Sequence, residues 1–180
     1  YVSSKEGKFH KHEIMLLEIE ILLQKIQMIR SNTYQTVDYT FPEYLTKKMS
    51  FNIYQLWDVP NYPELLKFLK GTRYYALLKE FEITIDLNEI SKKLTLAYYE
   101  EYIALVKANF KGRVQKDLLN IIYTSVELNT IAKIYRLKKY FNASKERIEK
   151  EVFIKHHRIP KHLIQELIEA KDAKQMMDIL

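Results

Sequence analysis

Apolar residues recur every three or four positions along most of the chain, the spacing that places them on one face of an α-helix. From Ile14 to Ile29 this spacing is nearly unbroken, and it predicts a helix over roughly 11–30. The same spacing predicts further helices over about 43–59, 61–69, 87–110, 114–141 (with a break near Thr124), 145–155, 160–170 and 173–180. Two strand-like segments, 83–85 and 152–154, are too short and isolated to build a sheet.

Glycine and proline are scarce, with three and four residues respectively in a chain of 180. Hairpins need glycine-containing turns, and nucleotide-binding folds need glycine-rich loops. We therefore expect an all-α protein made of helices joined by short polar turns, without a significant sheet and without an ATP-binding loop.

Polar residues stand where several helices are expected to begin. A side-chain oxygen at the N-cap accepts a hydrogen bond from one of the free amides of the first helical turn. Thr40 precedes Glu43 by three residues, and Asn61 precedes Glu64 by the same interval, a spacing typical of a capping box. We expect Thr40 and Asn61 to be N-caps.

The chain resembles itself when it is shifted by 111 residues. Residues 53–58 then align with 164–169, and the cap at Asn61 aligns with Asp172. This match predicts a duplicated helical unit with N-caps at both positions. The alternative is that any two amphipathic helix–turn–helix segments look alike. The second copy stops at Leu180, so the sequence ends in mid-unit, and we expect its N-terminus to be a cut end too.

Composition narrows the class of protein further. Hydrophobic residues make up 47% of the chain and charged residues 29%, which is typical of a globular protein. The absence of cysteine excludes disulfides and thiolate metal sites, and it fits a reducing compartment. The net charge of +6 permits an acidic partner without requiring one.

Residues that could carry chemistry do not form a recognisable site. His10 and His12 lie two residues apart, a spacing that does not place them on one helical face, so we expect solvated histidines and no metal site. Neighbouring carboxylates such as Glu18 and Glu20 are interpreted as parts of solvated helix faces. We expect no catalytic residue, no cofactor and no metal.

Basic and aromatic residues alternate over 134–141, a pattern that can bind nucleic acid. However, apolar residues occupy two faces of this helix, Leu128 on one and Ile134 on the other, which is more typical of a helix packed on two sides. We therefore expect no nucleic-acid binding, and we expect the Arg136 guanidinium to be buried and paired.

The segment 126–141 resembles the signature helix of the central-stalk C subunit of V/A-type rotary ATPases, called the d subunit in eukaryotes. The residues that carry the resemblance are Glu127, Leu128, Asn129, Tyr135, Arg136, Lys138 and Tyr140. The resemblance extends over about 95–180 and is thinner over 1–94. It divides the chain into a first helical unit, 1–94, and a second, 95–180, which is truncated at its C-terminal end.

The resemblance implies repeated helical units in a funnel-like body and a mechanical role without catalysis. Such a protein connects the membrane proteolipid ring to the central shaft of the soluble head, and it couples ATP hydrolysis or synthesis to ion transport. The implied location is cytoplasmic, peripheral to the membrane through the ring alone, in a bacterial version of the complex. The signature residues would be structural or interface residues. A helical-repeat adaptor for other proteins is the alternative, followed by a nucleic-acid-binding protein.

Overall fold

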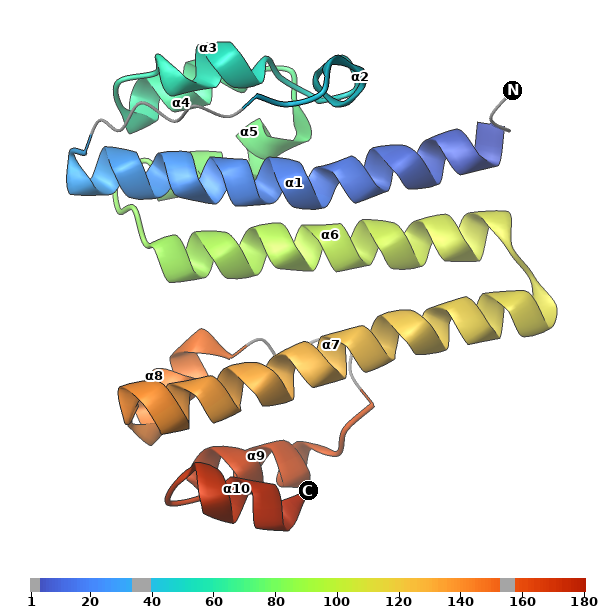
Figure 1. Cartoon of the computed structure of the whole chain (residues 1–180), viewed down its shortest axis with the longest axis vertical. Helices are drawn as coiled ribbons and strands as arrows, with labels where there is room; N and C mark the ends of the chain where they lie inside the picture. Colours follow the sequence, from blue (N-terminus) through green and yellow to red (C-terminus); the bar gives the residue numbers. More distant parts are fainter. Residues whose placement is uncertain (1–3, 34–39, 153–157) are drawn as a thin grey trace. The chain divides into compact units, whose positions relative to one another are not determined.

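The computed structural model describes residues 4–33, 40–152 and 158–180. Over these residues the chain is helical and contains no strand, which confirms the all-α prediction (Figure 1). The helices are α1 (Ser4–Ser31), α2 (Glu43–Thr46), α3 (Ile53–Trp57), α4 (Tyr62–Phe68), α5 (Arg73–Leu78), the 3-10 helix η1 (Lys79–Phe81), α6 (Leu87–Asn109), α7 (Gly112–Phe141), α8 (Lys145–Glu151), α9 (Lys161–Glu169) and α10 (Ala173–Ile179). The chain divides into two compact units, 1–105 and 106–180, at a boundary within α6.

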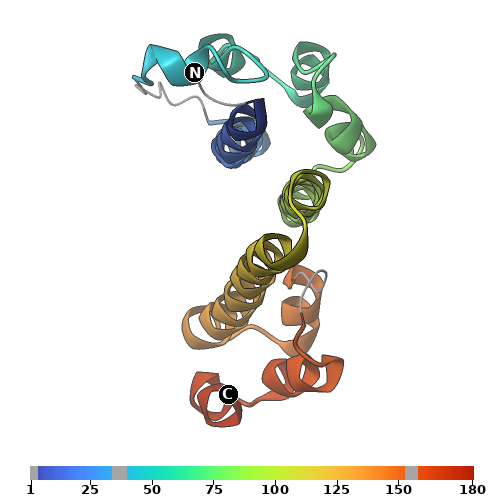
Figure 2. The same ribbon diagram turned by 90° about the vertical axis from the view of Figure 1, so that its right-hand side faces the viewer.

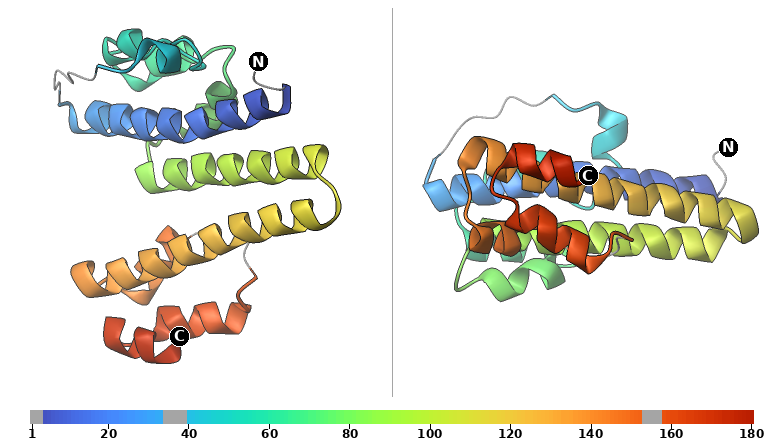
Figure 3. Two further views of the ribbon diagram at one scale, coloured as in Figure 1. Left: turned by 45° about the vertical axis from the view of Figure 1, so that its right-hand side comes forward. Right: turned by 90° about the horizontal axis from the view of Figure 1, so that it is seen from below.

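Unit 1 is built around the long helix α1. Its apolar face carries Met15, Leu22 and Ile26, which are fully buried against residues from α3, α4, α5 and α6. Helix α6 runs antiparallel to α1 alongside it (Figures 1 and 3). Because residues from four other helices meet on α1, this helix is the centre of the first hydrophobic core.

Unit 2 is built around α7 in a related way. The short helices α8, α9 and α10 gather around the C-terminal half of α7 (Figure 2). Ile134 and Leu137 of α7 pack there against Ile148, Leu167 and Met176, which come from the three short helices in turn. The core of this unit is therefore confined to one part of the long helix.

The structure confirms the N-caps at Asn61 and Asp172. Asn61 Oδ1 accepts a hydrogen bond of 3.0 Å from the amide of Glu64, and Asp172 Oδ1 accepts one of 2.8 Å from the amide of Gln175. The residues four positions after each cap are also buried alike, Leu65 in α4 and Met176 in α10. These features agree with the 111-residue repeat.

Three predictions about helix boundaries were wrong. The expected helix over 43–59 is divided into α2 and α3. Asn52 is the N-cap of α3, because its side-chain oxygen accepts hydrogen bonds from the backbone amides of Tyr54 and Gln55. The residue at the N-cap of α2 is Pro42, and not Thr40. The expected break near Thr124 does not occur, since α7 is continuous from Gly112 to Phe141.

Helices α1 and α7 are each followed by an asparagine in the left-handed region of the backbone. Asn32 follows α1 with φ of 50°, and Asn142 follows α7 with φ of 44°. Asparagine tolerates this conformation better than most residues other than glycine.

Among the described helices, none is long and apolar enough to cross a membrane. Of the two strand-like segments, 83–85 forms no strand, and 152–154 lies mostly outside the described residues.

Candidate functional site

A carboxylate and an ammonium group of α1 hold opposite ends of α3. Glu18, 2% exposed, accepts hydrogen bonds from the amide and, at 3.2 Å, the hydroxyl of Ser50, just before α3. Lys25, also 2% exposed, donates a hydrogen bond of 2.8 Å to the carbonyl oxygen of Trp57, the last residue of α3. We call Glu18 and Lys25 the anchor pair of unit 1.

Unit 2 has an anchor pair of the same kind on α7. Glu127 accepts a hydrogen bond of 2.6 Å from the amide of Arg158, three residues before α9, and it also binds the Arg158 guanidinium at 2.9 Å. Lys138 donates to the carbonyl oxygens of Ile168, at 2.7 Å, and Ala170, where α9 ends. Negative charge thus lies at the start of each short helix and positive charge at its end, as the helix dipole favours.

The spacing of each anchor pair matches the length of the helix that it holds. Lys25 lies seven residues after Glu18, whereas Lys138 lies eleven residues after Glu127. Helix α3 has 5 residues and α9 has 9. Because each residue adds about 1.5 Å to a helix, four further residues lengthen both the held helix and the anchor spacing by about 6 Å, roughly one turn. The two units therefore share one arrangement of the anchor pair and the short helix, which is about one turn longer in unit 2.

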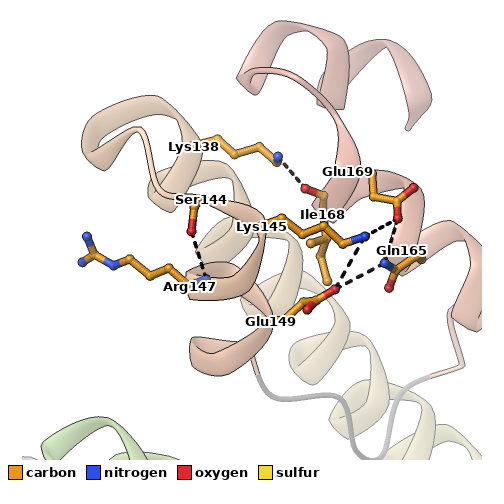
Figure 4. Close-up of polar contacts among 8 residues, drawn as sticks. All are labelled: Lys138, Ser144, Lys145, Arg147, Glu149, Gln165, Ile168 and Glu169. Atoms are coloured by element: carbon orange, nitrogen blue, oxygen red, sulfur yellow. Dashed lines mark hydrogen bonds and ion pairs between the residues drawn. The ribbon is translucent and has the colours of Figure 1, made fainter.

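Further polar contacts join α8 to α9 beside Lys138 (Figure 4). Lys145, at the start of α8, forms an ion pair of 2.5 Å with Glu169 at the end of α9. Gln165 donates to both Glu149, at 3.3 Å, and Glu169, at 2.9 Å. Together with the anchor pair, these contacts fix the short helices on the C-terminal half of α7.

The remaining signature residues face outward or lie at the edge of the core. Leu128 is 61% exposed and Tyr140 is 66% exposed. Tyr135 is half-buried against the core of unit 2, and Asn129 is exposed. Arg136 is exposed, and its Nε donates a hydrogen bond of 3.3 Å to the Ala132 carbonyl oxygen of its own helix. In the signature segment, Glu127 and Lys138 thus bind the segment around α9, whereas Leu128 and Tyr140 are exposed to solvent.

The prediction that Arg136 is buried was therefore wrong, and so was the prediction of two packed faces on α7. The buried residues of this helix, Ile122, Val126, Thr130, Ile134 and Leu137, form one stripe. Leu128 lies on the opposite side of the helix and is 61% exposed, and Phe141, the last residue of the helix, is exposed to the same degree.

Comparison with known proteins decides the family. The family model for the ATP synthase (C/AC39) subunit matches residues 7–180, nearly the whole chain. The chain belongs to this family. A curated relative, the C subunit of the A-type ATP synthase from Methanococcoides burtonii, is 33% identical over 89 residues. That match covers 49% of this chain and 24% of the relative, and no solved structure gives a significant match.

Several ionisable residues of this C/AC39-family chain lie where sequence reasoning did not place them. Glu18 was expected on a solvated face, but it is buried and accepts a hydrogen bond of 2.6 Å from the Tyr74 hydroxyl. Burial and the neighbouring Glu18 carboxylate raise the pKa of Tyr74. Burial lowers the pKa of Lys25, an effect that Asp58 partly opposes. The available signal was the position of Glu18 and Lys25 within the apolar stripe of α1, where a solvated charge has no place.

His12 also differs from the expectation of a solvated histidine. Its ring stacks on Tyr98, with centroids 4.3 Å apart, and lies 4.7 Å from the Tyr102 ring. Both ring nitrogens are buried and have no hydrogen-bond partner among the described residues. Burial, with a smaller contribution from Arg73, lowers the pKa of His12 to about 4. His10 and His162 are exposed, and His156 and His157 lie outside the described residues.

The described residues contain no cluster of three or more histidine and acidic side chains suited to a metal ion. The site that the structure offers is instead a long helix with one face tethered to short helices and one face in solvent. Such an arrangement suits a protein that is held rigid internally and contacts other proteins externally.

Proposed function

We propose that this chain is part of a non-catalytic central-stalk subunit of a V/A-type ATPase or ATP synthase. In this role the protein connects the proteolipid ring of the membrane to the central shaft of the soluble head, and it passes torque between ATP chemistry and ion movement. The observation that carries the proposal is the family match over residues 7–180. The stalk protein would be peripheral to the membrane on the cytoplasmic side, held there through the ring.

The anchor pairs support this role physically. A body that transmits torque must resist sliding of its helices past one another. In each unit the long helix holds a short helix at both ends, through Glu18 and Lys25 or through Glu127 and Lys138. Any slide along the helix axis would break hydrogen bonds at both ends at once. This bracing favours a mechanical part over a flexible adaptor.

Co-purification tests the proposal. The full-length protein would carry an affinity tag and would be isolated from its own membranes in mild detergent. We expect it to bring down the proteolipid and the shaft subunits together. Recovery with soluble proteins alone would favour the adaptor alternative, and recovery with nucleic acid in a steeply salt-dependent manner would favour a nucleic-acid-binding role.

A second experiment addresses the absence of catalysis. The isolated protein should neither bind nor hydrolyse ATP, because the coupling role places nucleotide chemistry in other subunits. Equilibrium dialysis with ATP and a phosphate-release assay provide the measurements. Micromolar affinity, or hydrolysis that disappears when a residue of this chain is changed, would contradict the proposal.

A further inference from the structure

Exposed aromatic and basic side chains gather where α7 ends and α8 begins. Tyr140 and Phe141, the last two residues of α7, are 66% and 61% exposed. Basic and aromatic residues alternate here in the sequence, and neither the hydrophobic core of unit 2 nor its anchor pair accounts for this pattern. We call this surface the basic-aromatic patch, and its residues are Tyr135, Arg136, Lys139, Tyr140, Phe141 and Arg147.

Cations and rings alternate in space as well as in sequence. Lys139 Nζ lies 5.1 Å from the centroid of the Tyr135 ring and 5.3 Å from that of the Tyr140 ring. In the same way, Arg147 Cζ of α8 lies 5.8 Å from the centroid of the Phe141 ring. Figure 4 shows the Arg147 side chain pointing away from α9 and from the contacts that join α8 to it. Residues of α7 and α8 thus form one continuous surface.

The positive charge of the chain is concentrated around this patch. Residues 133–151 contain seven basic and three acidic side chains, so they carry +4 of the total net charge of +6. Arg136 and Lys139 are exposed and three residues apart, which places them on the same side of α7. Within the described part of the chain, neither forms an ion pair with a carboxylate, whereas Arg147 pairs with Glu151 at 2.9 Å. Such a surface is complementary to an anionic partner.

The form of the patch favours a lipid surface over a nucleic acid as this partner. Single strands bind in basic grooves, where their bases stack on aromatic rings. The groove on α7 is lined by residues between 120 and 129 and includes none of the patch, and the cations of the patch lie over the rings on which bases would stack. The rings of Tyr140 and Phe141 instead protrude from the end of a helix. In membranes, aromatic rings favour the level of the headgroups, and cations are attracted to anionic headgroups.

We propose that the basic-aromatic patch binds anionic lipid headgroups at the membrane surface. Arg136 and Lys139 contact the lipid phosphates in this arrangement. The rings of Tyr140 and Phe141 lie among the headgroups beside them. The inference rests on the proposed function, because a subunit held at the membrane ring has lipid headgroups within reach. It adds a direct lipid contact to the attachment through the ring.

Sedimentation of the protein with vesicles tests the proposal. One set of vesicles consists of phosphatidylcholine alone, and in the other about one third of the lipid is phosphatidylserine. We expect binding to the second set and not to the first. Added salt should weaken this binding, because it screens the attraction between the cations and the anionic surface.

A charge-reversal variant assigns the binding to the patch. Arg136→Glu combined with Lys139→Glu should lower the affinity for the anionic vesicles by about tenfold or more, because attraction is replaced by repulsion. Lys47→Glu combined with Lys48→Glu is the matched control, since both residues are exposed, lie in unit 1 and give the same change in net charge. The control should retain most of the binding. Circular dichroism checks that both variants fold, and Arg136→Gln with Lys139→Gln replaces the reversal variant if that variant unfolds.

A third variant examines the aromatic part of the patch. Tyr140→Ser combined with Phe141→Ser should weaken binding to the anionic vesicles at unchanged net charge. Equal binding to both sets of vesicles, an equal loss in the Lys47 and Lys48 control, or no binding would overturn the proposal. Binding of the patch to a DNA oligonucleotide or to an acidic protein of the complex, without binding to vesicles, would overturn it too. If the protein fails to bind vesicles but still co-purifies with ring and shaft, the proposed function stands while the lipid assignment fails.

Discussion

Lys25 donates a hydrogen bond of 2.8 Å to the carbonyl oxygen of Trp57, although 32 residues separate the two in sequence. Lys138 makes the same kind of contact with Ile168 in the second unit, at 2.7 Å. In each case an ammonium group on a long helix satisfies the carbonyl end of a short helix. These two lysines give the most direct test of how the units are held together.

Replacement of Lys25 by methionine should destabilise the protein by about 1–3 kcal/mol. Methionine can fill the space of the lysine stem, so the main loss is the donor to the Trp57 carbonyl. Urea denaturation of Lys25→Met measures the effect. Lys67→Met is the control, because Lys67 is exposed and, within the described part of the chain, pairs with Glu64 of its own helix, so its replacement should leave the midpoint nearly unchanged. Equal midpoints for the two variants would show that the buried contact contributes nothing.

Loss of the Tyr74 hydroxyl should cost about 1.5–3 kcal/mol. This hydroxyl donates a hydrogen bond of 2.6 Å to the buried Glu18 carboxylate, and hydrogen bonds to charged groups are among the stronger ones. Tyr74→Phe removes it without changing the ring. Tyr54→Phe, at an exposed position, should leave the free energy of unfolding unchanged. A double-mutant cycle with Glu18→Gln should give a coupling energy well above zero, and additive effects would argue against the pair.

Acid should weaken the fold through His12. The pKa of His12 is about 4 in the folded protein, against 6.5 for an unperturbed histidine. The unfolded chain therefore takes up the proton first as pH falls, and stability is lost between about pH 6.5 and 4. The shift corresponds to roughly 3 kcal/mol.

His12→Phe should remove this part of the pH dependence, since it leaves an aromatic ring between Tyr98 and Tyr102. Chemical denaturation of the wild type and the variant at pH 7 and pH 5 provides the comparison. His162→Phe, at an exposed site, should keep the wild-type dependence. Parallel pH profiles for the wild type and His12→Phe would rule out this role for His12.

Arg136→Ala should change the free energy of unfolding by no more than about 0.5 kcal/mol. The side chain is exposed, and its bond to the Ala132 carbonyl stays within one helix. The measurement is urea denaturation of the isolated protein. A loss of about 3–5 kcal/mol would instead indicate a buried pair, as the sequence suggested.

Most local features were predicted correctly from the sequence, although the cap expected at Thr40 and the break expected near Thr124 did not form. The caps at Asn61 and Asp172 depend on a side chain and a backbone amide three residues apart, and both formed as predicted. The long helices followed from apolar periodicity in the same way. The cap at Asn52 was available in the sequence and was overlooked, which is why α2 and α3 were merged.

Burial could not be read in the same way, because it depends on which face finds a neighbour. Periodicity marks Leu128 as apolar, but the short helices cover the opposite side of α7 and leave it 61% exposed. The reverse happened to Glu18 and Lys25, whose charges are buried because partners from residues 50 and 57 reach them. These partners lie 32 residues away, beyond the range of any helical pattern.

The match between anchor spacing and helix length restricts how this architecture can change over time. An insertion of one or two residues into α3 would move its carbonyl end away from Lys25 and rotate it to another side of α1. An insertion of one whole turn, accompanied by a displacement of the lysine by one turn, restores both distance and direction. The lengths of 5 and 9 residues for α3 and α9 fit this rule. Viable insertions and deletions in these helices are thus expected in whole-turn steps, each coupled to a change on the long helix.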